Sequence, residues 1–89
     1  SPEDEIREKL ENIIKEVEKD YDIDESILRV TKGRKTLWLE VDFVIGEKSK
    51  IKTIKDQDFI REKLSKKLNH IAQEQWISIS FTGDRKWAI

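Results

Sequence analysis

Apolar residues recur at helical spacing in the first quarter of the chain, with charged residues between them. This pattern predicts an amphipathic helix of about five turns. Ser1 can cap the start of the helix and Pro2 suits its first turn, whereas the polar stretch 20–26 ends it. The apolar face carries Ile6, Leu10, Ile13, Ile14, Val17 and Tyr21.

The middle of the chain alternates in the way of a strand with two different faces. A long strand is expected over 36–45, a shorter one over 27–31, and a turn over 32–35. A last strand is expected over 75–82. The apolar face carries Leu37, Leu39, Val41, Phe43, Ile45, Ile77, Ile79 and Phe81. The opposite face carries Trp38, Glu40, Asp42, Val44, Trp76, Ser78, Ser80 and Thr82.

A second helix is predicted between the last two strands, and either Thr53 or Asp56 begins it. Its apolar residues are Ile60, Leu64, Leu68, Ile71 and Ala72. The order α-β-β-α-β indicates an α+β fold in which a three-stranded sheet carries both helices on its apolar face. Residues 36–82 would then form a right-handed parallel crossover.

Length and composition narrow the class of protein. The chain has 89 residues, which predicts one domain, and it has no cysteine for a disulfide or a thiolate metal site. A chain this short has a thin core, so dimerisation or partner binding is an expected source of further stability. A net charge of −1 with 42% charged residues argues against a dedicated nucleic-acid binder, which carries a basic excess.

The acidic residues after the first helix resemble the opening of a calcium-binding loop. Asp20, Asp22 and Asp24 have the spacing of its first ligands. That loop also needs a glycine at its sixth position and a glutamate at its twelfth, where this chain has Glu25 and Thr31. We therefore interpret these residues as a solvated turn.

The chain lacks the residue sets of an enzyme. His70 is the only histidine, and it is expected on the polar side of the second helix, without a nucleophile beside it. The glycines are isolated, so no phosphate-binding loop is present. We expect a binding or regulatory domain and no catalytic activity.

Two tryptophans are expected on the face of the sheet that the helices leave open. Trp38 and Trp76 point there by alternation, and exposed aromatic residues on a small domain usually mark an interface. Alternatively, charged side chains such as Arg29 cover them. A third possibility is an RNA-binding sheet, but Glu40 and Asp42 on the same face would repel phosphate.

Lysines are concentrated between the long strand and the second helix. One interpretation is contact with anionic lipid head groups or with an acidic partner, and the simpler alternative is a solvated loop. The lysines are Lys48, Lys50, Lys52 and Lys55.

Two stretches carry a resemblance to a known family. The strand LWLEVDFV (37–44) and the ending FTGDRKWA (81–88) resemble the C-terminal cytosolic domain of cation diffusion facilitator (cation efflux) transporters. With the α-β-β-α-β order, the resemblance extends over roughly residues 3–87. It implies a ferredoxin-like, metallochaperone-like fold below a membrane domain that exports divalent cations such as zinc. It also implies a fragment of a longer transporter, placed at the cytoplasmic face of a membrane.

The resemblance also implies a metal site between two protomers. Better-known members place ligands on the second strand, at the start of the second helix and on the last strand. The matching positions hold Asp42, Asp58, Ser80 and Thr82, so two carboxylates remain and the last-strand pair is lost. Asp42, Asp58 and Asp84 are therefore candidate ligands of a weak divalent-cation site. A metal-free, purely dimerising domain is the alternative.

These observations together predict a regulatory and dimerisation domain of a divalent-cation efflux transporter. We expect a homodimer with Trp38 and Trp76 at its interface, working with its own transmembrane domain and contacting an anionic membrane surface through Lys48, Lys50 and Lys52. The alternative is a free-standing ferredoxin-like sensor or dimerisation module without a membrane part.

Overall fold

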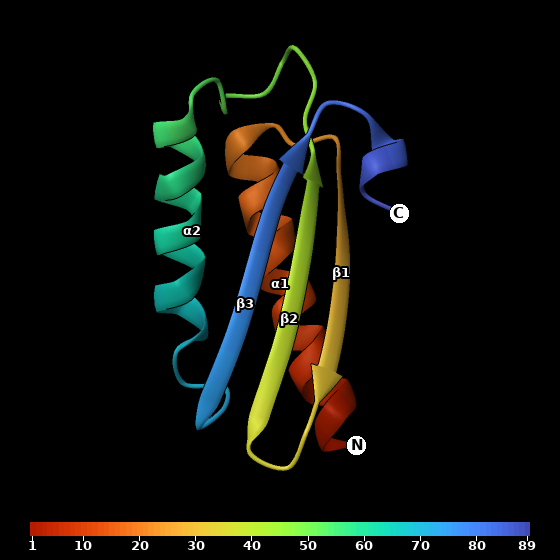
Figure 1. Ribbon diagram of the computed structural model, residues 1–89, viewed down its shortest axis with the longest axis vertical. Helices are drawn as coiled ribbons and strands as arrows, with labels where there is room; N and C mark the ends of the chain where they lie inside the picture. Colours follow the sequence, from red (N-terminus) through yellow and green to blue (C-terminus); the bar gives the residue numbers. More distant parts are fainter.

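The computed structural model describes residues 1–89 and begins with a long helix, α1 (Pro2–Tyr21) (Figure 1). Ser1 caps this helix as predicted: its Oγ accepts the backbone N–H of Asp4, and the Asp4 carboxylate accepts hydrogen bonds from Ser1 in return. These bonds satisfy donors that a helix start leaves free. The helix ends at Asp22, which adopts the left-handed conformation with φ 53° and ψ 55°.

Three strands form one mixed sheet in the order β1-β2-β3. β1 (Glu25–Lys32) pairs antiparallel with β2 (Thr36–Val44), and β2 pairs parallel with β3 (Glu74–Thr82). Parallel neighbours need a long connection, and α2 (Ile54–Leu68) lies within it. A short 3-10 helix, η1 (Arg85–Trp87), follows β3. All the predicted elements are present, and β1 is longer than predicted because its whole length pairs with β2.

The start of α2 uses both residues that the sequence nominated. Thr53 is the cap, and its side chain accepts the backbone N–H of Asp56 at 3.1 Å. The Asp56 carboxylate accepts the backbone N–H groups of Lys52 and Thr53 at 2.8 Å and 3.0 Å. These hydrogen bonds favour the charged form of Asp56 and hold its pKa below the ordinary value of 3.8. The bond from Lys52 has the largest effect, followed by the bond from Thr53.

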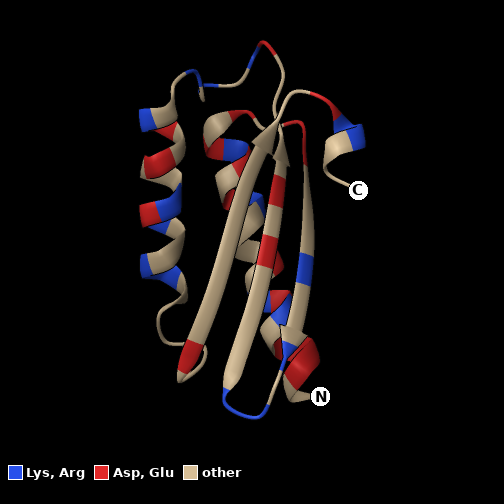
Figure 2. Cartoon of the chain, viewed as in Figure 1, with Lys and Arg blue, Asp and Glu red and all other residues tan.

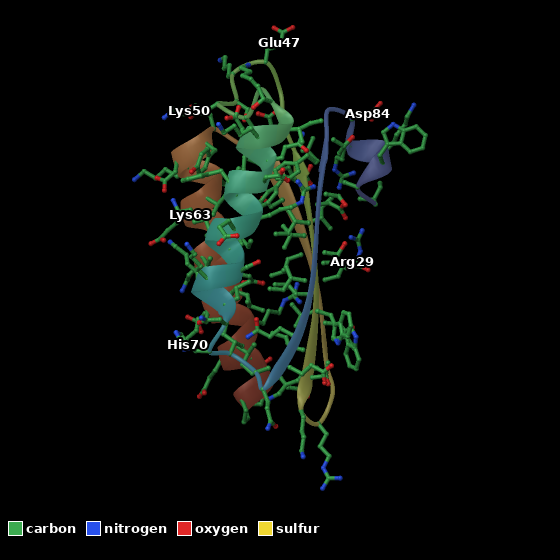
Figure 3. All side chains as sticks on the ribbon, turned by 60° about the vertical axis from the view of Figure 1, so that its left-hand side comes forward. Arg29, Glu47, Lys50, Lys63, His70 and Asp84 are labelled. Atoms are coloured by element: carbon green, nitrogen blue, oxygen red, sulfur yellow. The ribbon has the colours of Figure 1, made fainter.

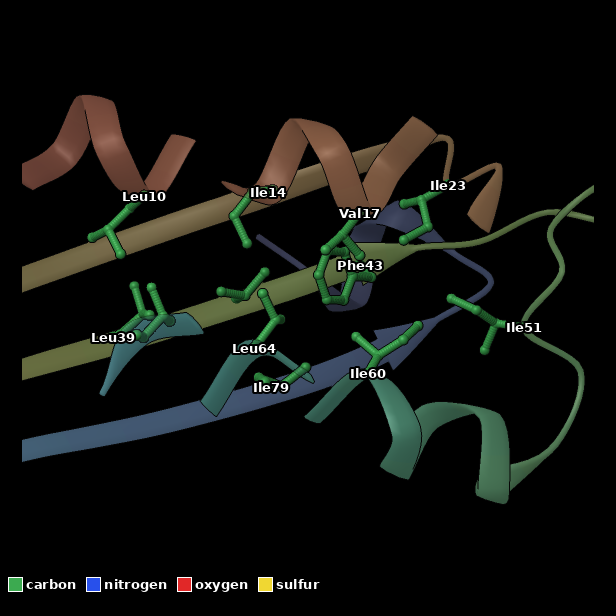
Figure 4. Packing of buried hydrophobic residues seen from close by; sticks show 12 residues of the cluster. Leu10, Ile14, Val17, Ile23, Leu39, Phe43, Ile51, Ile60, Leu64 and Ile79 are labelled. Atoms are coloured by element: carbon green, nitrogen blue, oxygen red, sulfur yellow. The ribbon is translucent and has the colours of Figure 1, made fainter. Parts of the chain in front are cut away.

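Both helices cover one face of the sheet and leave the other face open, as Figure 3 shows. Figure 4 shows the core between the layers, where side chains from β2 meet those of α1 and α2. Phe43 is fully buried and its ring lies 5.4 Å from that of Phe81. The predicted α+β arrangement is therefore confirmed. The core cluster consists of Leu10, Ile14, Val17, Ile23, Leu39, Val41, Phe43, Ile51, Ile60, Leu64, Leu68 and Ile79.

The two ends of the long axis are built from different segments. The N-terminus and the turn between β1 and β2 lie at one end, whereas the loop before α2 and the C-terminal η1 lie toward the other (Figure 1). Charged residues of both signs are interspersed on both helices (Figure 2). No helix of the chain combines the length and the apolar character needed to cross a lipid bilayer.

Candidate interaction surface on the open face of the sheet

The open face presents two neighbouring tryptophans. Trp38 on β2 and Trp76 on β3 are direct partners in the parallel ladder, so both side chains leave the sheet side by side. They are 46% and 58% exposed. The direction predicted for both side chains is therefore correct, and no charged side chain hides them from solvent.

The tryptophans border a shallow hollow of about 190 Å³, and we call the two indoles with this hollow the tryptophan platform. Enclosed small-molecule sites usually measure about 300–1,000 Å³, so the platform suits the surface of a macromolecular partner better. The lining residues are Trp38, Leu39, Glu40, Trp76, Ile77 and Ser78.

Neighbouring residues hold the platform in place. A Cβ atom at Gly33 would lie 3.0 Å from the ring of Trp38, so a larger residue in the hairpin turn would press on this ring. Gly33 does not have a positive φ. The indole N–H of Trp76 donates to Glu74 at 3.2 Å, and Glu74 also accepts from the hydroxyl of Thr36 at 3.4 Å. Side chains ordered in this way lose little conformational entropy when a partner binds.

Arg29 on β1 controls the charge beside the platform. Its Nη1 lies 2.7 Å from the Asp42 carboxylate and 3.9 Å from that of Glu40. Its Nη2 donates to the backbone carbonyl of Ala88 at 2.6 Å. The guanidinium therefore pairs closely with Asp42 and lies near Glu40, so one of the two negative charges that β2 presents on the open face is balanced.

Val44 is a buried residue on the open face of the sheet. It points to that face by alternation, yet it is only 8% exposed. The physical reason is the C-terminal segment 83–89, whose η1 lies on the side of the sheet opposite the helices (Figure 3). Ala88 of this segment is 2% exposed. Alternation gives the direction of a side chain but cannot show that a distant segment folds over it.

The three candidate metal ligands do not lie together in one chain. Asp42 is on the open face and bonded to Arg29, whereas Asp58 is on α2 and pairs with a guanidinium of the same helix at 3.0 Å. Asp84 caps η1, accepting the backbone N–H of Lys86 at 3.0 Å. No cluster of three or more histidine, cysteine or carboxylate side chains in the chain could hold a metal ion. A site using these residues would need a second chain.

Part of the ligand set that the resemblance implies is nevertheless close in space. Asp42 pairs directly with Ser80 across the β2–β3 ladder, and Thr82 follows two positions later on the same face. The hydroxyl of Thr82 accepts the backbone N–H of Asp84 at 3.1 Å. Hydroxyl groups are weak zinc ligands, so Asp42 is the only strong ligand among these positions.

The lysine-rich loop is fixed at two internal positions. Ser49 and Ile51 are 1% and 4% exposed. The Ser49 hydroxyl donates to the carbonyl of Tyr21 at 2.9 Å and accepts the backbone N–H of Ile51 at 3.2 Å. These anchors were not predicted from the sequence, because Ser49 bonds a residue 28 positions earlier in the chain. The exposed residues between and beside them are Lys48, Lys50 and Lys52.

Two further interpretations concern polar surface residues. Asp22 closes α1 in the left-handed conformation, and Asp20, Asp22 and Asp24 are all exposed, as expected of a solvated turn. His70 is exposed, as expected of a surface histidine.

Comparisons with protein-family models, curated proteins and solved structures find no match to this chain. The function of the chain must therefore be inferred from its own structural features. These features are paired tryptophans on an open face, carboxylates beside them of which Asp42 pairs with Arg29, and a terminal segment over the part of that face around Val44.

Proposed function

We propose that the chain is a homodimerisation domain that serves as the cytosolic regulatory domain of a divalent-cation (zinc-type) efflux transporter. The observation that carries this proposal is the tryptophan platform, where Trp38 and Trp76 are paired and about half exposed. Aromatic side chains bring much apolar area to an interface at low entropic cost. The proposed occupant of the platform is a second copy of the chain.

The charges of the open face fit a symmetric pair. In a two-fold contact each patch meets its own copy, so Glu40 and Asp42 would face like charges. Arg29 pairs with Asp42 at 2.7 Å within its own chain and lies 3.9 Å from Glu40, which reduces this repulsion by balancing one of the two charges. The net charge of −1 also keeps the overall repulsion between two copies small.

One orientation of this dimer places the same ends of the two protomers together. The N-terminus lies at the end of the molecule where β2 begins (Figure 1), and Trp38 lies near the start of β2. A two-fold axis parallel to the strands would place platform against platform and both N-termini at the same end. The two lysine-rich loops would then lie together at the opposite end of the dimer, which is the end expected to meet an anionic membrane surface (Figure 1).

The transporter part of the proposal rests on the resemblance of residues 37–44 and 81–88 and on the α-β-β-α-β order. Ser80 and Thr82 occupy two positions at which the resemblance implies metal ligands, and hydroxyl groups bind zinc weakly. We therefore propose that direct contact between the protein surfaces, and not a shared metal ion, holds the two protomers together. The domain would lie at the cytoplasmic face of the membrane. Hydrophobic spans encoded before Ser1 would support the transporter, and their absence would favour a free-standing dimerisation module.

Analytical ultracentrifugation from micromolar to millimolar concentration tests the proposal. We expect a reversible dimer, and we expect Trp38→Ser to weaken it by about 2 kcal/mol or more, roughly 30-fold in the dissociation constant. The matched control is Phe59→Ser, because Phe59 is 61% exposed but lies on α2, away from the open face. The control variant should dimerise like the wild type.

Two results would contradict the proposal. One is a wild-type chain that stays monomeric at millimolar concentration, and the other is a Trp38→Ser variant that dimerises like the wild type. Circular dichroism and thermal unfolding establish that both variants are folded, so that a lost dimer is not mistaken for a lost fold.

A further inference from the structure

The C-terminal segment 83–89, which we call the C-terminal strap, shares the open face with the tryptophan platform. Figure 3 places its η1 on the side of the sheet away from the helices. Ala88 in the strap and Val44 on β2 are 2% and 8% exposed, although neither belongs to the core cluster. The strap therefore covers the part of the open face around Val44 and leaves the platform uncovered.

The contacts that hold the strap are mostly polar and close to solvent. Arg29 donates to the Ala88 carbonyl, and Nε of Arg85 lies 2.9 Å and 3.1 Å from the two carboxylate oxygens of Glu25. The side chains of Arg85 and Glu25 are 59% and 39% exposed, so solvent and salt weaken this pair. Ala88 is the only buried residue of the strap, and its side chain is small. A segment held in this way opens more readily than the core elements.

The strap and a second sheet cannot occupy the same half of the open face. Sheets that pack face to face lie about 10 Å apart, and the strap lies in that space. With the strap closed, the platform is the large apolar surface that the sheet itself leaves open, and the strap adds Trp87 and Ile89, which are 73% and 70% exposed. Two half-exposed tryptophans offer roughly 200 Å². A stable interface buries about 800 Å² on each partner, so the platform alone supports only a weak dimer.

We infer that the C-terminal strap is an autoinhibitory element that limits homodimerisation through the open face. This inference rests on the proposed function, because it assumes that a second copy is the occupant of that face. Release of the strap uncovers Val44 and lets the partner sheet approach along the whole of β2. Arg29 keeps its bond to Asp42 after release, so the open face gains apolar area without an unpaired carboxylate at that position.

The test opens the strap without shortening the chain. Ala88→Asp puts a carboxylate where a 2% exposed methyl group lies, and burying that charge disfavours the closed strap. Arg85→Gln removes the ion pair with Glu25. The matched control is Lys86→Gln, because the Lys86 ammonium contacts only Asp84 within the strap, at 3.7 Å. We expect the dimer dissociation constant to fall about tenfold or more for Ala88→Asp, by a smaller factor for Arg85→Gln, and not at all for Lys86→Gln.

Amide hydrogen exchange identifies opening directly, as faster exchange in 84–89 while the rest of the sheet stays protected. If Ala88→Asp opens the strap and the dimer becomes no tighter, the inference is overturned. The proposed function still stands in that case, provided that Trp38→Ser dissociates the wild-type dimer. If neither the wild type nor Ala88→Asp dimerises at millimolar concentration, the proposed function and the inference fail together. Should Ala88→Asp unfold the domain, a chain ending at Asp84 gives the same comparison.

Discussion

Nη1 of Arg29 lies 2.7 Å from Oδ2 of Asp42, so an ion pair already uses the carboxylate that best matches a metal ligand in this chain. The Asp42 side chain is only 20% exposed. A cation entering there would have to displace a guanidinium or share the carboxylate with it. In the isolated chain, the Asp42 carboxylate is therefore the ion-pair partner of Arg29 and is not free to bind a metal ion.

We predict that the isolated domain binds zinc weakly or not at all. The candidate carboxylates are separate, and the strong imidazole and thiolate ligands are absent apart from the exposed His70. Isothermal calorimetry with zinc at neutral pH is the measurement, with His70→Ala as the control for the lone imidazole. A sub-micromolar site that persists in His70→Ala would contradict this prediction.

The lysines of the loop before α2 are predicted to matter little for stability. Changing Lys48, Lys50 and Lys52 together to Gln should alter the free energy of unfolding by less than about 0.5 kcal/mol, because all three are exposed. Ile51→Ala in the same loop should cost about 2–5 kcal/mol, because Ile51 is 4% exposed. Denaturant unfolding of both variants measures the contrast. Equal effects would show that the lysines are structural.

The same triple variant tests the expected contact with an anionic membrane surface. We predict that the wild-type domain co-sediments with vesicles rich in phosphatidylserine and that the triple variant does so less. The matched control changes the exposed Lys9, Lys15 and Lys19 of α1 to Gln and should leave binding unchanged. Wild-type binding that is absent, or equal on neutral vesicles, would contradict the contact.

Asp56 predicts a pH dependence at the start of α2. Its pKa is lower in the folded chain than its ordinary value of 3.8, so the unfolded chain takes up the proton first as the pH falls. Its contribution to stability is present above about pH 4 and is lost as the pH falls through the folded pKa. Asp56→Asn should therefore be less stable than the wild type near neutral pH and should converge with it in acid.

Thermal unfolding of the wild type and of Asp56→Asn, measured over a range of pH, tests whether their stabilities converge. Asp58→Asn is the control, because the Asp58 carboxylate bonds a side chain of its own helix and caps no backbone N–H. A constant gap between Asp56→Asn and the wild type down to strong acid would contradict the assignment.

The elements that local rules govern could be predicted from the sequence. The capped start of α1, the two faces of β2 and the direction of both tryptophans follow from periodicity and from residues three or four positions apart. The anchors of the lysine-rich loop could not be predicted in this way. Ser49 bonds Tyr21, which is 28 positions earlier, and no local pattern specifies such a contact.

Only the part of the candidate site that local patterns determine could be predicted. The platform follows from alternation, but the strap depends on Arg85 meeting Glu25, 60 positions earlier. The partner of Asp42 was also beyond local rules. From the sequence, Arg29 was a candidate to cover the tryptophans, but it pairs with Asp42 within the chain, because Arg29 lies opposite Glu40 in the antiparallel β1–β2 register.

The last prediction is that Trp38 and Trp76 act as one contact in the dimer. They are ladder partners and line one hollow, so a partner surface that packs on one indole must also touch the other. Removing either should disrupt the shared contact, and the two losses should not add. We expect Trp76→Ser to weaken the dimer about as much as Trp38→Ser, and the double variant to be little weaker than either.

Dissociation constants of the wild type, both single variants and the double variant form a double-mutant cycle that measures this coupling. The expected coupling free energy is about 1 kcal/mol or more, within the range for residues in direct contact. Trp76→Phe is the matched control: it keeps an aromatic ring but loses the N–H that donates to Glu74 at 3.2 Å, so it should lose much less affinity than Trp76→Ser. Additive losses would mean that the two indoles meet separate parts of the partner, and the platform would then not be a single site.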